Sequence, residues 1–238
     1  MLNELLAERN LPDVLSFGGE KIRTAKEFDA KREEIRRLLE SEEYGVLPPK
    51  PEHLEVVAES DYPAFCRGSA TLTHYTAKVT LDGEEFSFPF YAAVPKRNVP
   101  VPAFVFINFR SQVPDFYCPL EEVMDRGYAV FGFCYLDVAS DDGNFRKACA
   151  KFLSKNRRAS DASGKIMMWA WAAMRVMDFI ETLPEIDHDN VAVIGHSRLG
   201  KTALVTGAFD ERFRYVISND SGCSGAAITR GKIGESLE

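Results

Sequence analysis

The stretch VAVIGHSRLGKTAL, residues 191–204, constrains this chain more than any other. Its first four residues are apolar and predict a buried strand. Gly195 is expected to end that strand, and a helical pattern begins at Gly200, so Ser197 lies in the turn between them. A serine at the tip of a strand–turn–helix is typical of a nucleophile elbow. In that turn the hydroxyl stands above the sheet and the first helical N–H groups face a developing oxyanion.

The same residues also match a second pattern. Gly195–Thr202 reads G-x-x-x-x-G-K-T, the phosphate loop of nucleotide hydrolases. The strict elbow pattern G-x-S-x-G fails, because Leu199 occupies the position of its second glycine. Context favours the elbow, since a phosphate loop normally follows the first strand of its domain and several predicted strands precede this one. A nucleotide-binding protein that uses Gly195–Thr202 is the less favoured alternative.

Strands and helices alternate around this stretch. From about Ala70 the apolar period is two on either side of Asp82-Gly83, a strong signal for a hairpin. Buried strands are predicted in PAFVFINF (102–109) and YAVFGFCYL (128–136), and a further short strand in FRYVISND (213–220). Helices are predicted after the capping box Thr24–Glu27, over Glu121–Arg126 and in KIMMWAWAAMRVMDFIETL (165–183). Strands separated by helices imply crossovers. The chain is therefore predicted to be a single α/β domain over residues 1–238, with a mainly parallel sheet, flanking helices, an N-terminal helix and an antiparallel hairpin.

One segment is polar and charged. Asp141–Gly164 contains Gly143, Lys151, Lys155, Arg157 and Arg158. We predict an excursion over the carboxyl edge of the sheet, with a short helix, that frames a functional site. A plain surface insertion is an equally good interpretation.

Composition excludes several classes of protein. The net charge of −7 argues against nucleic acid as a partner. No apolar stretch approaches a membrane span, and the N-terminus does not resemble a secretory signal. The five cysteines are widely spaced, odd in number and without a C-x-x-C pair, so free thiols, no metal site and a cytoplasmic location are expected.

Acyl transfer by serine needs a nucleophile, a base and an orienting acid. Ser197 is the candidate nucleophile, and Asp220, at the end of the next predicted strand, is the candidate acid. The four histidines are His53, His74, His188 and His196, and none follows Asp220. In the hydrolase order of nucleophile, acid and histidine, the base would lie beyond Glu238. We therefore expect a chain truncated at its C-terminus, with its last strands missing and little turnover.

The elbow carries a family resemblance. GHSRLGK resembles the G-C-S-R-x-G-K of the glucuronoyl esterases, with His196 in place of cysteine. The segments EYGVLPPKPE, WAWAAMRVMDFIE and SNDSGCSGAA extend the similarity from about Phe17 to the end. The chain is thus similar to α/β-hydrolase carbohydrate esterases of the glucuronoyl and acetyl xylan esterase type, in which Leu199 is no defect.

The resemblance implies a role for each matching residue. Ser197 would attack an ester carbonyl, Arg198 would stabilise the oxyanion with its side chain, and Lys201 would contact sugar hydroxyls. Asp220 matches the family acid, although some relatives place that acid one strand later. The implied substrate is a small carbohydrate ester, acetyl or glucuronoyl, and no cofactor or metal is implied. A non-catalytic sugar-binding or scaffold protein of the same fold remains the principal alternative.

Overall fold

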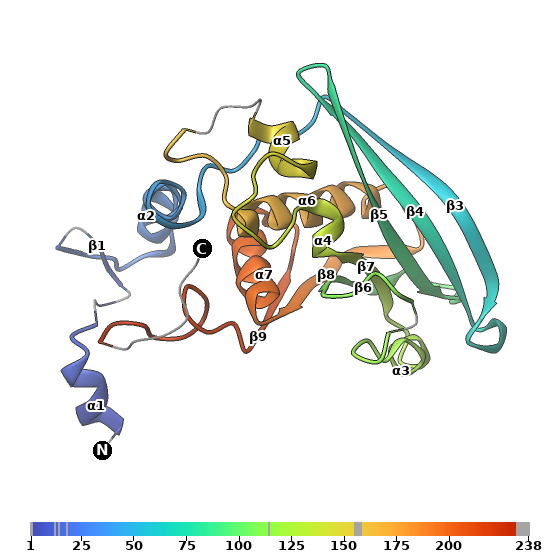
Figure 1. Ribbon diagram of the computed structural model, residues 1–238. Coiled ribbons are helices and arrows are strands. Elements are labelled where there is room, and N and C mark those ends of the chain that lie inside the picture. Colours follow the sequence, from blue (N-terminus) through green and yellow to red (C-terminus); the bar gives the residue numbers. More distant parts are fainter. Residues whose placement is uncertain are drawn as a thin grey trace.

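The computed structural model describes residues 2–11, 13, 15–17, 19–113, 115–154 and 159–231. A seven-stranded sheet in the order β3-β4-β5-β7-β6-β8-β9 forms its centre (Figure 1). The strands are β3 His53–Phe65, β4 Ala70–Leu81, β5 Glu84–Pro95, β6 Val101–Asn108, β7 Ala129–Cys134, β8 Ile186–His196 and β9 Tyr215–Asn219. Pairing is antiparallel from β3 to β7 and parallel from β7 to β9. The sheet is therefore mixed, and the predicted mainly parallel sheet is correct only for its last four strands.

The remaining elements flank this sheet. They are α1 Leu2–Glu8, a small β1 Ser16–Phe17 and β2 Glu20–Lys21 ribbon, α2 Ala25–Leu39, α3 Leu120–Asp125, α4 Tyr135–Val138, α5 Ala148–Ser154, α6 Lys165–Ile180 and α7 Arg198–Phe209, with short helical turns at Glu40–Tyr44 and Cys66–Gly68. The capping box before α2 is confirmed, because the Thr24 hydroxyl and the Glu27 carboxylate each accept from the other's backbone N–H. The extent of a single domain over 1–238 stays a prediction.

The hairpin is confirmed as predicted. β4 and β5 pair without interruption from Ala70↔Pro95 to Leu81↔Glu84. Asp82 and Gly83 both have positive φ, 53° and 77°, which is the backbone of a type I′ turn. In Figure 1 the hairpin extends beyond the parallel half of the sheet, with β3 along its outer edge. β3 was not predicted, because its half-exposed edge position leaves little apolar alternation in the sequence.

Helix α6 forms the main part of the core. The sequence predicts one apolar face, but 14 of its 16 residues are buried. The reason is coverage from several sides: Trp169 Nε1 donates to the Ala139 carbonyl at 3.1 Å, and Trp171 Nε1 donates to the Pro49 carbonyl at 3.0 Å. The helix thus lies between the sheet and two distant segments of the chain. This buried layer supports the carboxyl edge of the parallel strands.

Helix α2 is a looser attachment. None of its residues is fully buried, although an apolar face packed on the domain was predicted. It contacts the end of α7 through charged side chains: the Arg36 guanidinium lies 4.8 Å from the centre of the Phe209 ring, and Arg32 pairs with Glu211. Among the described residues, no helix is long and apolar enough to cross a bilayer.

Candidate active site

The predicted elbow is a single residue. β8 continues through His196 and α7 begins at Arg198, so only Ser197 lies between strand and helix. Its φ of 55° and ψ of −125° are strained for a residue with a side chain. The Ser197 N–H donates to the Asn219 carbonyl of β9 at 2.9 Å, which secures the turn. The strand was expected to end at Gly195 and the helix to begin at Gly200; both boundaries were wrong, because the turn is tighter than predicted.

Two glycines make this tight turn possible. A Cβ on Gly195 would lie 2.1 Å from the Leu199 carbonyl oxygen, and a Cβ on Gly200 would lie 2.9 Å from the Asn219 carbonyl oxygen. Leu199 itself is fully buried in the core. The close approach of backbones requires glycine at positions 195 and 200. Burial in the core favours an apolar residue at position 199, where the strict elbow pattern has its second glycine.

The phosphate-loop alternative is wrong. A phosphate loop needs several residues between strand and helix to surround the phosphates with N–H groups, and here there is one. The Thr202 hydroxyl, which would bind Mg²⁺ in such a loop, donates to the Arg198 carbonyl at 3.0 Å. The matching letters of Gly195–Thr202 thus fall mostly within α7.

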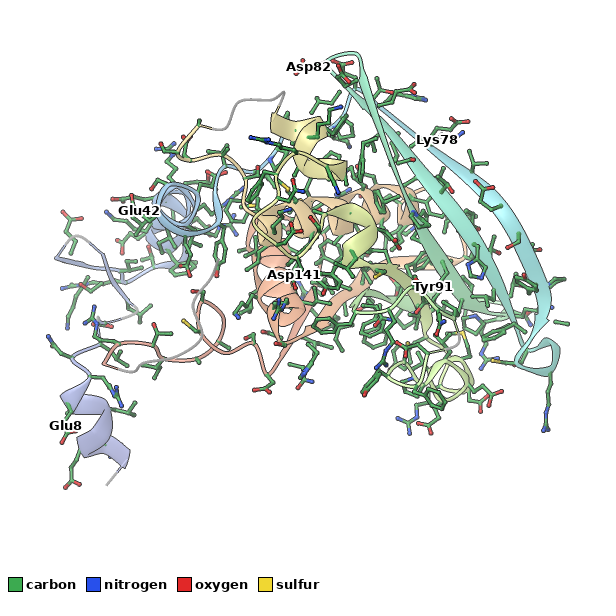
Figure 2. The ribbon with its side chains drawn as sticks, in the orientation of Figure 1. Glu8, Glu42, Lys78, Asp82, Tyr91 and Asp141 are labelled. Atoms are coloured by element: carbon green, nitrogen blue, oxygen red, sulfur yellow. The ribbon has the colours of Figure 1, made fainter. Side chains whose placement is uncertain are left out.

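Arg198 lies beside the candidate nucleophile and is held by a carboxylate. Its Nη1 forms an ion pair with Asp141 Oδ2. The Tyr135 hydroxyl donates to the same oxygen at 3.3 Å, and burial, followed by the charge of Asp141, raises the pKa of Tyr135. Figure 2 shows Asp141 beside α7. Arg198 is the first residue of α7, the position at which a helix presents its first backbone N–H groups.

The predicted short helix of the Asp141–Gly164 excursion is present as α5, whose Phe152 packs against Phe86 of β5 and Trp171 of α6. That this excursion frames a functional site stays a prediction. The excursion is held by Lys165, a buried residue whose Nζ donates to the Asn144 carbonyl at 2.7 Å and to Ser140 Oγ at 3.3 Å. Lys155, Arg157 and Arg158, which were part of the prediction, lie outside the described residues. Sequence reasoning missed Asp141 itself; its only signal was its place at the start of this excursion.

Asp220 directly follows β9, the strand that pairs with β8, which leads to Ser197. It is exposed, with a φ of 47°, and within the described residues its carboxylate makes no hydrogen bond. The backbone contact of Ser197 with Asn219 places the two strand ends side by side. The candidate nucleophile and acid are therefore on neighbouring strand ends, as predicted, but not in contact through a base.

The described residues show no histidine bonded to Ser197 or Asp220. His196 Nδ1 lies 3.1 Å from Asn219 Nδ2, His188 Nε2 lies 2.9 Å from the Leu183 carbonyl, and the His74 ring meets the Tyr62 ring edge-on. The identity of the base stays a prediction.

Lys201 is placed differently from what its predicted role needs. Contact with sugar hydroxyls requires an accessible ammonium group, but the residue is 2% exposed. It lies one turn after Ser197, and its N–H donates to the Ser197 carbonyl at 3.1 Å. A role for Lys201 in sugar binding stays a prediction, and the burial seen here does not support it.

A second loop at this edge follows β6 and was not predicted to matter. The Asn108 side chain donates to Asp115 Oδ2 at 2.9 Å, and Arg110 Nη1 donates to Asp115 Oδ1 at 3.2 Å. The Arg110 guanidinium also lies 4.1 Å from the centre of the Tyr117 ring. In α/β-hydrolases the loop after the equivalent strand supplies one N–H of the oxyanion hole. This loop therefore lies where such a donor is needed.

Two further observations concern the chemistry of the site. Among the described residues, no group of three or more His, Cys, Asp or Glu side chains could hold a metal ion. All five cysteines are free thiols. The cytoplasmic location stays a prediction.

Comparison with known proteins agrees with this geometry. The family described as "Glucuronyl esterase, fungi" matches residues 77–236. A carbohydrate esterase from an unknown prokaryotic organism is 30% identical over 95% of this chain and 62% of its own length. A 4-O-methyl-glucuronoyl methylesterase of Neurospora crassa is 29% identical over 94% of this chain and 52% of its own length.

A solved structure agrees as well. The glucuronoyl esterase from Solibacter usitatus superposes with a TM-score of 0.83 at 28% identity, over 92% of this chain and 66% of that protein. The chain thus spans between about half and two thirds of the length of these relatives. Because the family match covers more than half of its residues, this α/β-hydrolase chain belongs to the glucuronoyl esterase family.

Proposed function

We propose that this chain is a serine esterase that cleaves esters of a glucuronoyl-type sugar acid. The observation that carries the proposal is the position of Ser197, alone in a strained turn between β8 and α7 with Arg198 next to it. The family to which the chain belongs, the glucuronoyl esterases, supports the same reaction. The Neurospora relative is named for methyl esters of 4-O-methyl-glucuronate, which makes the glucuronoyl ester the preferred substrate over an acetyl ester.

The proposed reaction has two steps. The Ser197 oxygen attacks the ester carbonyl carbon, its proton passes to a base, and the alcohol leaves with a proton as the acyl-enzyme forms. Water then attacks the acyl-enzyme and releases the sugar acid. The Arg198 N–H and guanidinium are the proposed donors to the oxyanion in both steps, because they stand at the start of α7 where negative charge develops. Asp220 is the proposed acid that orients the base.

Within the described residues no histidine is bonded to Ser197, and this suggests a direct test. We expect little turnover of the methyl ester of 4-O-methyl-glucuronic acid by the chain alone. Added imidazole should act as an external base and raise the rate by at least about tenfold, since general base catalysis contributes on the order of 10²–10⁴. The comparison proteins are Ser197→Ala, which should stay at background, and Ser224→Ala, a serine of the following loop, which should respond like the parent.

Acetylated xyloside, assayed in parallel, separates the two acyl groups and should be the poorer substrate. Equal imidazole acceleration of the parent and Ser197→Ala would contradict the assignment of the nucleophile. Failure of imidazole to accelerate either substrate would favour a non-catalytic sugar-binding protein.

A further inference from the structure

A cavity of about 110 Å³ opens at the carboxyl edge of β7, apart from Ser197. Its lining comes from β3, β4, β5, β7, the loop after β6 and α4, and includes Glu59, His74, Thr76, Tyr91, Arg110 and Asp137. None of the residues assigned above to the proposed reaction lines it. The cavity therefore needs an explanation of its own.

The floor of the cavity is aromatic and tightly packed. His74 pairs with Tyr91 across β4 and β5, and Tyr91 pairs with Gly132 across β5 and β7. A Cβ on Gly132 would lie 2.5 Å from the Tyr91 ring, so glycine allows that ring to lie directly on β7. The Tyr91 hydroxyl is 3.9 Å from Cys118 Sγ, on the side of α3 (Figure 2). Tyr91 is 5% exposed, so its ring gives the cavity a rigid floor.

Two of the polar groups that line the cavity, the carboxylates of Asp137 and Glu59, can accept hydrogen bonds. Asp137 is half-buried, and burial raises the pKa of its carboxyl. Within the described residues neither Asp137 nor the exposed Glu59 has a hydrogen bond or an ion pair at its carboxylate. A partly desolvated carboxylate without a donor is costly, and a ligand hydroxyl would relieve that cost. Two carboxylates against the single Arg110 guanidinium disfavour an acidic ligand such as a uronate.

The cavity and the nucleophile lie on one edge of the sheet. Ser197 follows β8, the cavity opens at the end of β7, and β6 lies between them. Two strand spacings are about 10 Å, which a short oligosaccharide can span. The Phe109 ring bridges this interval, because its centre lies 6.3 Å from that of His196 and 5.3 Å from that of Tyr135.

We propose that this cavity is a subsite for one neutral pyranose unit of the polysaccharide that carries the ester. The aromatic floor, the carboxylates without donors, the exclusion of a further negative charge and the position along the edge support it together. The inference rests on the proposed function for the identity of the polysaccharide, but binding at the cavity needs no turnover and can be measured separately.

The test is a titration of the Ser197→Ala chain with methyl β-D-xylopyranoside, followed by amide NMR. Signals of His74, Thr76 and Gly132 should shift, with far smaller shifts for glucuronate. Asp137→Asn should weaken binding about tenfold, through loss of a hydrogen bond to a charged acceptor. Glu59→Trp, which places a large ring at an exposed rim position, should block binding. Glu84→Gln, an exposed change at the hairpin turn, should bind as the parent does.

Several results would overturn the subsite. These are unchanged amide signals at the cavity, full affinity in both Asp137→Asn and Glu59→Trp, or equal binding of glucuronate. Failure of the esterase itself is recognised differently. In that case imidazole does not rescue turnover, while the xyloside still shifts the cavity signals of Ser197→Ala.

Discussion

The turn after β8 and the loop after β6 leave neighbouring strands at the same edge of the sheet, and they are held in different ways. The turn is Ser197 alone, fixed by its N–H bond to Asn219 and by backbones too close for any side chain at Gly195. The loop after β6 is fixed by hydrogen bonds from the Asn108 and Arg110 side chains and the Tyr117 N–H to one carboxylate, Asp115.

This difference separates two tasks of the proposed site. A nucleophile must stand in one place, and a turn that has no room to relax provides that placement. A loop held by hydrogen bonds to one carboxylate depends on the charge of that carboxylate. The turn is therefore expected to respond to added volume, and the loop to lost charge.

Adding volume to the turn should have the largest effect. Gly195→Ala places a Cβ 2.1 Å from the Leu199 carbonyl oxygen, a backbone atom that cannot move away without shifting α7. We expect a loss of about 3 kcal/mol in the free energy of unfolding, measured by urea denaturation, together with loss of any reaction at Ser197.

The matched control is a glycine of the excursion. Gly143 has no neighbouring atom within 4 Å of a built Cβ, so Gly143→Ala should change the free energy of unfolding by less than about 0.5 kcal/mol. Similar destabilisation by both alanines would mean that the close approach at Gly195 does not determine the turn.

Removing charge from the loop should have the next largest effect. Burial by itself would raise the pKa of Asp115, but hydrogen bonds from the Asn108 side chain, the Tyr117 N–H and Arg110 outweigh burial and hold the pKa below its ordinary value. The unfolded chain then binds the proton more readily than the folded chain. The stabilisation is complete above the ordinary aspartate pKa of about 3.9 and is lost as the pH falls through the lower folded value.

Asp115→Asn tests this pH dependence. The Asp115 side chain is only 3% exposed, so losing its charged hydrogen bonds should cost about 2 kcal/mol at neutral pH. In urea unfolding the gap between parent and variant should narrow as the pH falls below about 4. Glu85→Gln, an exposed change in β5, should track the parent throughout. A gap that is the same at neutral and acidic pH would show that shape, not charge, holds the loop.

The same contrast explains what could be predicted from the sequence. The elbow was found because an apolar run, a serine and glycines occupy adjacent positions, and local sterics act over adjacent positions. The hairpin was found for the same reason, from Asp82-Gly83. Asp141 was missed because its partner Arg198 is 57 residues away, and a carboxylate in a polar segment looks the same whether it is solvated or paired. The burial of nearly all of α6 likewise depends on distant segments of the chain, and the spacing of apolar residues within the helix cannot reveal these segments.

The contacts of Asp115 could not be predicted either, although its partners are close in the sequence. Its partners Asn108 and Arg110 are a few residues away, yet nothing in their spacing marks a buried network. The base is a different case, because the order of nucleophile, acid and histidine gave a definite expectation. That expectation stays a prediction.

The smallest expected change in the free energy of unfolding is at Arg198, which is held both by the tight backbone of the turn and by a carboxylate. Arg198 belongs to the elbow by its backbone, but its guanidinium is held by Asp141, as the loop after β6 is held by Asp115. Because this ion pair is partly exposed, Asp141→Asn should change the free energy of unfolding by less than about 1 kcal/mol. A released Arg198 should nevertheless slow covalent reaction of Ser197 with a fluorophosphonate, followed by mass spectrometry, by about tenfold, since loss of an oxyanion donor outright costs on the order of 10²–10³.

Tyr135→Phe refines this prediction. It keeps the Asp141 charge and removes only the hydroxyl that donates to Asp141 Oδ2 at 3.3 Å, so the labelling rate should fall by less than about threefold. If Asp141→Asn instead labels faster than the parent, then Asp141 competes with the oxyanion for Arg198 and does not position it. In that case neither the backbone of the elbow nor the Arg198 side chain would need a distant carboxylate to hold it in place, whereas the loop after β6 would still depend on Asp115.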